Sequence, residues 1–486
     1  MTITPATPGS LAIPDNQIIE LMVEVPAGQV IKYDLAALVS AFDVGDPGRI
    51  AVETDGSRHA IVTIYPSNPL ATMPPPSDDD MLMDNLGRIV VGRYHNGRPA
   101  RRKLFDPRTG SAVRALTFGT TGAGKSRTVQ YVLACEKRNG IVSWYGDLKG
   151  GQSAPEARGQ VDWLATSQEE VILMLRAAVA VAQQSRQPRY AAMGRNAFVI
   201  GDPDPLLSVR IDEANRLLEK GAPYREEATY LVKELGRTGR SVGIGEELDA
   251  QASHLEELGG SDTLRAMLKE GEVTLLRWSS SMMRQLVADG LLPAGTQLMP
   301  IPKSLKPRVL RSQFAEGVDD DDDVCDTQGT AYLLSGPYPA SMMRHFRIGS
   351  IMPMPGLDPE ILALYGPGDP ARLEETSLDA AGEAYAARGT DAMAALCEAV
   401  RDEQAAKSAK VQAANGGRGP QLLEDRIRVV LAASDDPMTA DQITAAVNAD
   451  GGKEVRLGSV RTRLSSLADA GDDVARVGHG LYAAVR

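Results

Sequence analysis

A glycine-rich stretch has the residue types and the spacing of a phosphate-binding loop. It reads GTTGAGKS from Gly119 to Ser126 and fits the pattern G-x-x-x-x-G-K-[ST]. In such a loop backbone N–H groups point into one concavity at a helix N-terminus, the Lys ammonium reaches the β- and γ-phosphates, and the Ser hydroxyl ligates Mg²⁺. RALTF before the loop predicts a strand, and SRTVQYVLA after it predicts a helix. We expect Mg-ATP to bind here, with Lys125 as a catalytic residue, through Gly119, Thr120, Thr121, Gly122, Ala123, Gly124, Lys125, Ser126 and Arg127.

A pair of acidic residues closes a second apolar stretch. LLSVRIDEA follows the loop by about 90 residues and contains Asp212 and Glu213. A P-loop ATPase holds Mg²⁺ with an acid on a neighbouring strand, and a second group orients the attacking water. We expect Ser126 and Asp212 to hold the metal and Glu213 to act as the general base. Arg210 interrupts the apolar pattern, so we expect it at an edge of the sheet or at a contact between subunits.

Composition and charge bound the class of protein. The chain has 486 residues and a net charge of −12, so two or three domains are expected. No stretch approaches the roughly 18 apolar residues of a membrane span. The N-terminus does not read as a secretory signal, and the three cysteines have no metal-ligand spacing. We expect a cytoplasmic protein with no integral membrane segment. Nucleic acid stays open as a partner because basic residues gather before the loop, at Arg88, Arg93, Arg98, Arg101, Arg102, Lys103, Arg108 and Arg114.

Four regions follow one another along the chain. Residues 1–66 alternate apolar and polar residues and predict a small strand-containing domain. Residues 81–354 alternate strand and helix patterns, which predicts a parallel sheet covered by helices. Residues 355–420 read as a helical spacer that ends in a flexible linker. Residues 421–486 give three helical patterns and a hairpin. The predicted fold class is α/β, with a RecA-like P-loop ATPase domain, a small N-terminal domain and a C-terminal winged helix.

The last region carries a candidate DNA-reading surface. In a winged helix the third helix enters the major groove and the wing lies on the DNA backbone or in the minor groove. Val460, Leu464 and Leu467 recur at helical spacing and are expected to pack inward. The alternative is a winged helix that contacts protein, since the segment is not basic overall. The expected DNA contacts are Ser459, Arg461, Thr462 and Arg463 on the helix, with Arg476 and His479 in the wing.

The stretch KELGRTGRSVGIGEELDAQ resembles the FtsK/HerA-type DNA translocases, where an Arg- and Gly-containing turn leads to a strand closed by Gln. This resemblance implies that Arg237 and Arg240 act as arginine fingers on a neighbouring subunit and that Gln251 senses the γ-phosphate. The alternative is that the two arginines only stabilise a helix C-terminus. The strand departs from the family, whose residues there are apolar, at Glu246, Glu247 and Asp249.

Further similarity lies on both sides of that stretch. WYGDLKGGQSAPE resembles the second-strand signature of the family and implies that Asp147 and Lys149 lie near the nucleotide or at a subunit contact. The layout as a whole resembles the TraB-like conjugative translocases of actinobacterial plasmids. That resemblance implies double-stranded DNA as the partner, a homo-oligomeric ring, taken as a hexamer, and attachment to the envelope through a partner protein.

Two other functions remain open at this point. The first is a replication or regulatory DNA-binding ATPase that uses ATP as an assembly switch. The second is a secretion-type ATPase of the same superfamily that moves protein.

Overall fold

The computed structural model consists of two units, Met1–Val400 and Arg401–Arg486. It describes residues 17–54, 56–251, 259–261, 269–277, 300–305, 325–339, 341–352, 354–414, 423–434, 436–449, 454–470, 474–478 and 480–484, together with Leu264, Ala266 and Leu298. Among the described helices none is long and apolar enough to cross a membrane.

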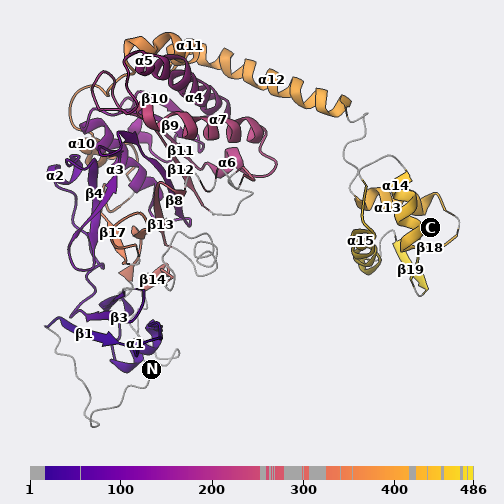
Figure 1. Cartoon of the computed structure of the whole chain (residues 1–486), viewed down its shortest axis with the longest axis horizontal. Coiled ribbons are helices and arrows are strands. Elements are labelled where there is room, and N and C mark those ends of the chain that lie inside the picture. Colours follow the sequence, from indigo (N-terminus) through magenta and orange to yellow (C-terminus); the bar gives the residue numbers. More distant parts are fainter. Residues whose placement is uncertain are drawn as a thin grey trace. The chain divides into compact units, whose positions relative to one another are not determined.

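A ten-stranded sheet is the largest sheet that the described residues form (Figure 1). Its order is β10-β9-β11-β12-β8-β13-β16-β17-β4-β5. The strands from β10 to β13 are parallel, and those that follow are antiparallel. The parallel part agrees with the α/β prediction, whereas the antiparallel edge is not part of it. The strands are β4 (Arg88–Tyr94), β5 (Pro99–Lys103), β8 (Arg114–Gly119), β9 (Val142–Asp147), β10 (Trp163–Ala165), β11 (Leu207–Asp212), β12 (Ile244–Ala250), β13 (Glu272–Leu276), β16 (Thr330–Leu333) and β17 (Met343–His345).

Helices cover both faces of this sheet, and strand β9 shows why. Its residues alternate between two hydrophobic cores: Trp144 packs with the residues of α4 and α7, and Tyr145 packs with those of α3. Gly146 faces α4 closely, because a Cβ there would lie 2.8 Å from Val171 Cγ2. The helices of this domain are α2 (Asp78–Met81), α3 (Lys125–Arg138), α4 (Gln168–Ala180), α5 (Gln187–Ala192), α6 (Asn215–Leu218) and α7 (Arg225–Thr238).

The chain segment after the sheet folds back onto the same domain. It contains α10 (Pro359–Leu364) and α11 (Leu378–Ala387), and α11 packs against α4. Arg388 and Tyr385 both bind the buried carboxylate of Asp162, at 2.9 and 2.8 Å. The beginning of the region expected as a spacer is therefore held on the domain that contains the ten-stranded sheet. The long helix α12 (Ala392–Ala414) follows.

The N-terminal region forms a three-stranded antiparallel sheet with one helix. The strands β1 (Ile19–Glu24), β3 (His59–Ile64) and β2 (Ile50–Thr54) lie in that order. Helix α1 (Leu35–Ala41) begins after Asp34, whose side chain accepts hydrogen bonds from Ala36 N and Ala37 N.

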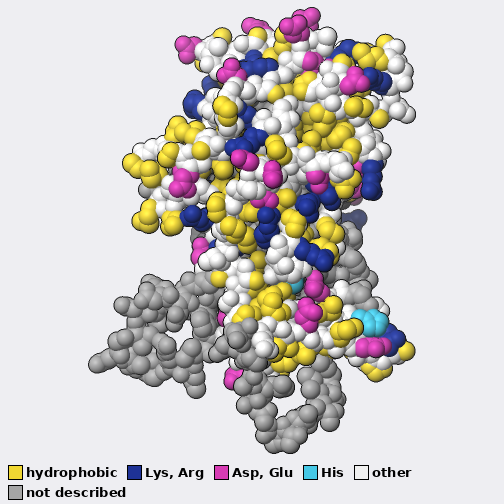
Figure 2. Space-filling view, turned by 90° about the vertical axis from the view of Figure 1, so that its left-hand side faces the viewer, with side chains coloured by type: hydrophobic (Ala, Val, Ile, Leu, Met, Phe, Trp, Pro, Cys, Tyr) yellow, Lys and Arg dark blue, Asp and Glu magenta, His cyan; other side chains and the backbone are white. Residues whose placement is uncertain are grey.

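Lys and Arg side chains gather across the middle of the face of the molecule that Figure 2 shows, among apolar and acidic ones.

Beyond the end of α12, the described residues of the second unit form three helices and a small sheet. Helices α13 (Leu423–Ala432), α14 (Ala440–Ala449) and α15 (Leu457–Ala470) pack on a sheet of β18 (Met438–Thr439), β20 (Leu481–Ala484) and β19 (Val474–Gly478). Val460 and Leu464 are fully buried and Leu467 is nearly so, as their spacing predicts.

Candidate nucleotide site

The glycine-rich loop connects β8 to α3, as predicted. Gly124 precedes the first turn of the helix with φ of 105°, and no described side chain caps that turn. A Cβ at Gly124 would lie 3.2 Å from Gly329 N, so a larger residue would be crowded as well as strained. The free N–H groups of the first turn and the helix dipole make this terminus suited to bind an anion.

Lys125 is folded into the loop that it follows. Its Nζ donates a hydrogen bond of 2.8 Å to Gly119 O and lies 4.0 Å from Glu213 Oε1. Burial lowers the pKa of Lys125, while the charges of Glu213, Asp212 and Asp249 oppose that shift. The ammonium is therefore in place beside the loop and next to the acidic pair.

Three acidic residues lie in register at or next to the carboxyl ends of neighbouring parallel strands. Asp212 on β11 lies opposite Asp147 on β9 and Asp249 on β12. All three are buried, and Asp212 Oδ2 has no hydrogen-bond partner in the described part of the chain. Burial raises the pKa of Asp212, the Ser153 hydroxyl opposes that shift, and the charges of Asp147 and Glu213 raise it further. A buried carboxylate oxygen without a partner is suited to a cation or to the water that a cation holds. The carboxylate of Asp212 therefore fits the role of Mg²⁺ ligand expected for it.

Glu213 lies at the centre of the site. Its φ is 56°, an uncommon backbone conformation for a residue with a side chain, and its side chain is 2% exposed. Gln251 Nε2 donates to both carboxylate oxygens at 3.1 and 2.9 Å, and Lys149 Nζ lies 2.6 Å from Oε1. Burial raises the pKa of Glu213, but Lys149, Gln251 and Lys125 outweigh it, so the pKa lies below its usual value. The structure thus brings together Lys125, Glu213 and Gln251.

The order of the strands explains this convergence. β12 lies between the loop strand β8 and the strand β11 that carries the acidic pair. Gln251 follows β12 directly, so it emerges at the same carboxyl edge as Glu213 and the loop. The central domain has the RecA-like P-loop fold.

Arg277 is a residue of this site that sequence reasoning missed. It follows β13 directly, and its Nη1 donates a hydrogen bond of 2.9 Å to Gly122 O in the loop. Its Nε donates to Thr327 Oγ1 at 3.1 Å, and Asp326 pairs with the other end of the guanidinium. The register shows the reason, since Leu276 lies opposite Gly119, but that signal becomes visible only when β13 is known to pair with β8.

The expectation for Arg210 is wrong. Arg210 lies inside the sheet, 1% exposed, rather than at an edge or a subunit contact. It forms ion pairs with Glu247 and with Asp249 on the neighbouring strand, and Arg102 also binds Glu247. Glu247 and Asp249, which depart from an apolar strand, and Arg210, which departs from its own, therefore compensate each other.

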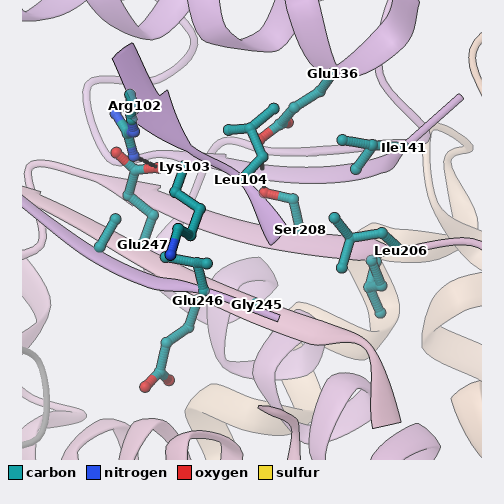
Figure 3. Close-up of a pocket in the computed structure, with 13 residues that line it drawn as sticks. Arg102, Lys103, Leu104, Glu136, Ile141, Leu206, Ser208, Gly245, Glu246 and Glu247 are labelled. Carbon is teal, nitrogen blue, oxygen red and sulfur yellow. Dashed lines mark hydrogen bonds and ion pairs between the residues drawn. The ribbon is translucent and has the colours of Figure 1, made fainter. Parts of the chain in front are cut away.

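Figure 3 shows the pocket at one end of this group. Arg102 and Glu247 point toward one another, and Glu136 of α3 lies across from them near Ser208. Glu136 accepts hydrogen bonds from Ser208 Oγ at 2.8 Å and from Ser143 Oγ at 2.6 Å. Glu246 points to the opposite face.

The remaining predicted residues lie away from the loop. Arg127 pairs with Asp358 at 3.6 Å, so its guanidinium is directed to the segment after the sheet. Arg237 ends α7, 55% exposed, and pairs with Glu234 at 2.8 Å. Arg240, also exposed, precedes β12. Both arginines lie at the amino edge of the sheet, and the seven residues of β12 separate them from Gln251 by about 20 Å.

The basic residues before the loop do not form one surface. Arg102 and Arg114 are buried, and Arg88 pairs with Asp84 at 2.8 Å. Several of these basic residues therefore neutralise acidic residues of the same chain and do not form a surface for nucleic acid.

The candidate DNA contacts on α15 are exposed, and Arg461 and Arg463, two residues apart, lie at opposite margins of the exposed side of the helix. Ser459, Arg461, Thr462 and Arg463 are exposed there, and Arg461 and Arg463 pair with Asp441 and Glu424 at 3.3 and 2.9 Å. Arg476 is exposed on β19. His479 lies outside the described residues.

Comparisons with other proteins give structural similarity alone. No protein-family model matches the chain, and no curated protein matches it. The pCW3 conjugation coupling protein TcpA, in its monomer form with ATPγS, is 16% identical with a TM-score of 0.43, over 68% of this chain and 85% of that one. The cytoplasmic domain of the type VII secretion ATPase EccC of Thermomonospora curvata is 18% identical with a TM-score of 0.39, over 61% of this chain and 33% of that one. VirB4 of Thermoanaerobacter pseudethanolicus is 10% identical with a TM-score of 0.33, over 56% and 98%.

Proposed function

We propose that the chain is an ATP hydrolase that works as a motor on double-stranded DNA. The observation that carries the hydrolase is the convergence on Glu213, whose carboxylate lies 4.0 Å from Lys125 Nζ and is held by Gln251. A buried acid next to the phosphate-binding lysine, oriented by an amide, is what an in-line attack by water on the γ-phosphate requires.

Each residue of the site has a role in this proposal. The N–H groups of the loop and Lys125 bind the phosphates, and Arg277 holds the loop at Gly122. Ser126 and Asp212 would hold Mg²⁺, which neutralises charge on the phosphate oxygens when bound. Glu213 takes the proton of the attacking water, and Gln251 orients its carboxylate.

We propose further that the subunits assemble into a ring, taken as a hexamer. Arg237 and Arg240 lie at the edge of the sheet opposite to their own loop, so they cannot reach their own nucleotide. Both are exposed and therefore accessible to the site of a neighbouring copy. An arginine supplied across such a contact stabilises the charge of the transition state and makes hydrolysis depend on assembly.

The second unit is proposed to be a winged helix that selects the DNA. The exposed polar face of α15, with Arg461 and Arg463, opposes a buried apolar face. A helix of this kind can enter the major groove, with its arginines near phosphates and base edges. Together with the ATPase, this supports movement of DNA in conjugal or mobile-element transfer, at the membrane through a partner protein.

The test is an ATPase assay of the full chain with and without double-stranded DNA, combined with a measurement of its oligomeric state. We expect turnover that duplex DNA stimulates, and an oligomer when ATP and DNA are both present. Lys125→Ala should abolish nucleotide binding, whereas Glu213→Gln should bind ATP and lose turnover by about 10²- to 10⁴-fold. A chain that stays monomeric and hydrolyses ATP at the same rate with and without DNA would contradict the motor.

One observation favours a second candidate, a secretion-type ATPase for protein. Both arginines of the α15 face already pair with acids of their own unit, which reduces the free positive charge that DNA would meet. The affinity of the full chain for duplex DNA decides between the two. The protein-directed candidate predicts an affinity no higher than that of an unrelated protein with a similar negative charge.

A further inference from the structure

Lys149 is held in place by the end of strand β9. Its backbone N donates to Asp147 Oδ1 at 2.9 Å, and Asp147 Oδ2 accepts from Ser153 N at 2.7 Å. One buried carboxylate therefore fixes both ends of the turn that carries Lys149. The side chain reaches from this turn to Glu213 Oε1, at 2.6 Å.

The two partners differ in their access to solvent. The Lys149 side chain is 32% exposed, whereas that of Glu213 is 2% exposed. The lysine can move off without opening the fold, because its four-carbon stem is flexible and its backbone is held separately. Glu213 cannot move as freely, since Gln251 binds its two carboxylate oxygens.

The contact conflicts with the work proposed for Glu213. A general base must be within hydrogen-bond reach of the proton that it takes, and its carboxylate must be available to that water. Here Oε1 is within reach of two ammonium groups, Lys149 at 2.6 Å and Lys125 at 4.0 Å. The two ammonium groups repel one another, and both are directed to the same carboxylate.

A γ-phosphate placed at the loop would give the two ammonium groups a second anionic partner. It brings negatively charged oxygens to Lys125, and charge-assisted hydrogen bonds from lysine to phosphate are strong. We propose that Lys149 is a positioning residue that exchanges Glu213 for the γ-phosphate when ATP binds. In the absence of a γ-phosphate Lys149 occupies the base, and in its presence the base is released toward water.

This proposal rests on the proposed ATPase function and adds a residue that distinguishes ATP from ADP. ADP has no γ-phosphate, so it leaves Lys149 on Glu213. Lys149 should therefore contribute to the affinity for ATP and hardly at all to that for ADP. A lysine that only braces the turn would affect both nucleotides alike.

The experiment measures the binding of ATPγS and of ADP to the full chain by calorimetry. Lys149→Met should lower the affinity for ATPγS by about tenfold or more, because one charge-assisted hydrogen bond is lost. It should change the affinity for ADP by no more than about twofold. Lys149→Arg should retain most of the preference for ATPγS. Lys103→Met is the matched control, because Lys103 is 34% exposed and pairs with Asp106 at 3.2 Å, and it should change neither affinity.

A double-mutant cycle tests the exchange itself. Glu213→Gln removes the charge that competes with the γ-phosphate for Lys149, so it should raise the affinity for ATPγS several-fold. In the Lys149→Met background the same change should give no gain. Equal weakening of both nucleotides by Lys149→Met, or additive effects in the cycle, would overturn the proposal.

The two proposals fail in different ways. If Lys125→Ala binds ATPγS as well as the unaltered chain does, the nucleotide site is wrong. If Lys125→Ala loses binding while Lys149→Met keeps the full preference for ATPγS over ADP, only the role of Lys149 is wrong.

Discussion

Arg210 Nη1 lies 3.2 Å from Asp249 Oδ2, between two neighbouring strands inside the sheet and on the face that α3 covers. Burial alone would lower the pKa of Arg210, but the charges of Glu247, Asp249 and Glu136 raise it instead. The arginine thus stays charged and compensates acids whose strand ends at the nucleotide site.

Removal of this arginine should destabilise the protein severely. Arg210→Met leaves Glu247 and Asp249 with less compensation in the sheet, which costs about 3–5 kcal/mol in the free energy of unfolding. Urea unfolding followed by circular dichroism measures it. Arg195→Met, which removes a pair with Asp202 at the surface, should cost less than about 1 kcal/mol. A comparable loss in both variants would show that burial is not the cause.

Glu246 should make stability depend on pH. Burial raises its pKa to about 8, although Arg114 opposes the shift, and neither carboxylate oxygen has a hydrogen-bond partner among the described residues. The folded state therefore holds a proton that the unfolded state releases above a pKa of about 4.3. The free energy of unfolding should fall as pH rises from about 4 to about 8.

The variant Glu246→Gln should remove that dependence. The free energy of unfolding of the variant minus that of the unaltered chain should rise by on the order of a few kcal/mol from pH 5 to pH 8.5. Unfolding curves at both pH values measure the difference, with the exposed Glu219→Gln as control. An equal effect of Glu246→Gln at the two pH values would contradict the raised pKa.

Arg277 should matter for nucleotide binding without contact to the reacting atoms. Arg277→Met removes the hydrogen bond to Gly122 O and the ion pair with Asp326, so the loop loses a contact that holds it in place. We expect the affinities for ATPγS and for ADP both to fall, by about fivefold to tenfold each. Calorimetry with the two nucleotides measures this. A loss confined to ATPγS would instead place Arg277 at the γ-phosphate.

The arginines at the amino edge should act on a neighbouring copy. A chain with Arg237→Ala and Arg240→Ala keeps its own loop, and a Lys125→Ala chain keeps its arginines. Each alone should be inactive, and a mixture of the two should regain part of the ATPase activity if the arginines act in trans. No recovery in mixed oligomers that demonstrably form would leave the pair between Arg237 and Glu234 as a local helix contact.

The α15 face should control DNA affinity. Arg461→Ala with Arg463→Ala should weaken duplex binding and reduce the slope of its salt dependence by about two. Arg428→Ala on α13 is a control that removes one positive charge elsewhere in the unit. A titration at several salt concentrations gives both quantities, and an unchanged slope would exclude this face as the contact.

The sequence was sufficient where a local pattern decides the structure. The loop, the acidic pair and the amphipathic pattern of α15 each depend on residues close together in the chain, and the fold places them as predicted. Arg210 was misplaced because its partners Glu247 and Asp249 lie on another strand, and a single strand pattern does not show which strand is its neighbour. The position of Lys149 against Glu213 and of Arg277 against the loop depends on strand order in the same way.

The antiparallel edge of the sheet was beyond prediction for a related reason. Strands β16 and β17 have four and three residues, too few for an alternation to be recognised, and β17 pairs with β4 from far earlier in the chain. Their place is determined by long-range pairing rather than by local propensity.

The attachment of α11 limits how the protein can be shortened. Tyr385 lies against both Trp144 and Trp163, with ring centroids 5.4 and 6.0 Å apart, and its hydroxyl ends on Asp162. A fragment that stops at β17 would expose two tryptophans and would remove the Tyr385 and Arg388 contacts of the buried Asp162. Such a fragment would be prone to aggregate. An expression fragment that contains the ten-stranded sheet should therefore extend to Val400, the end of the first unit.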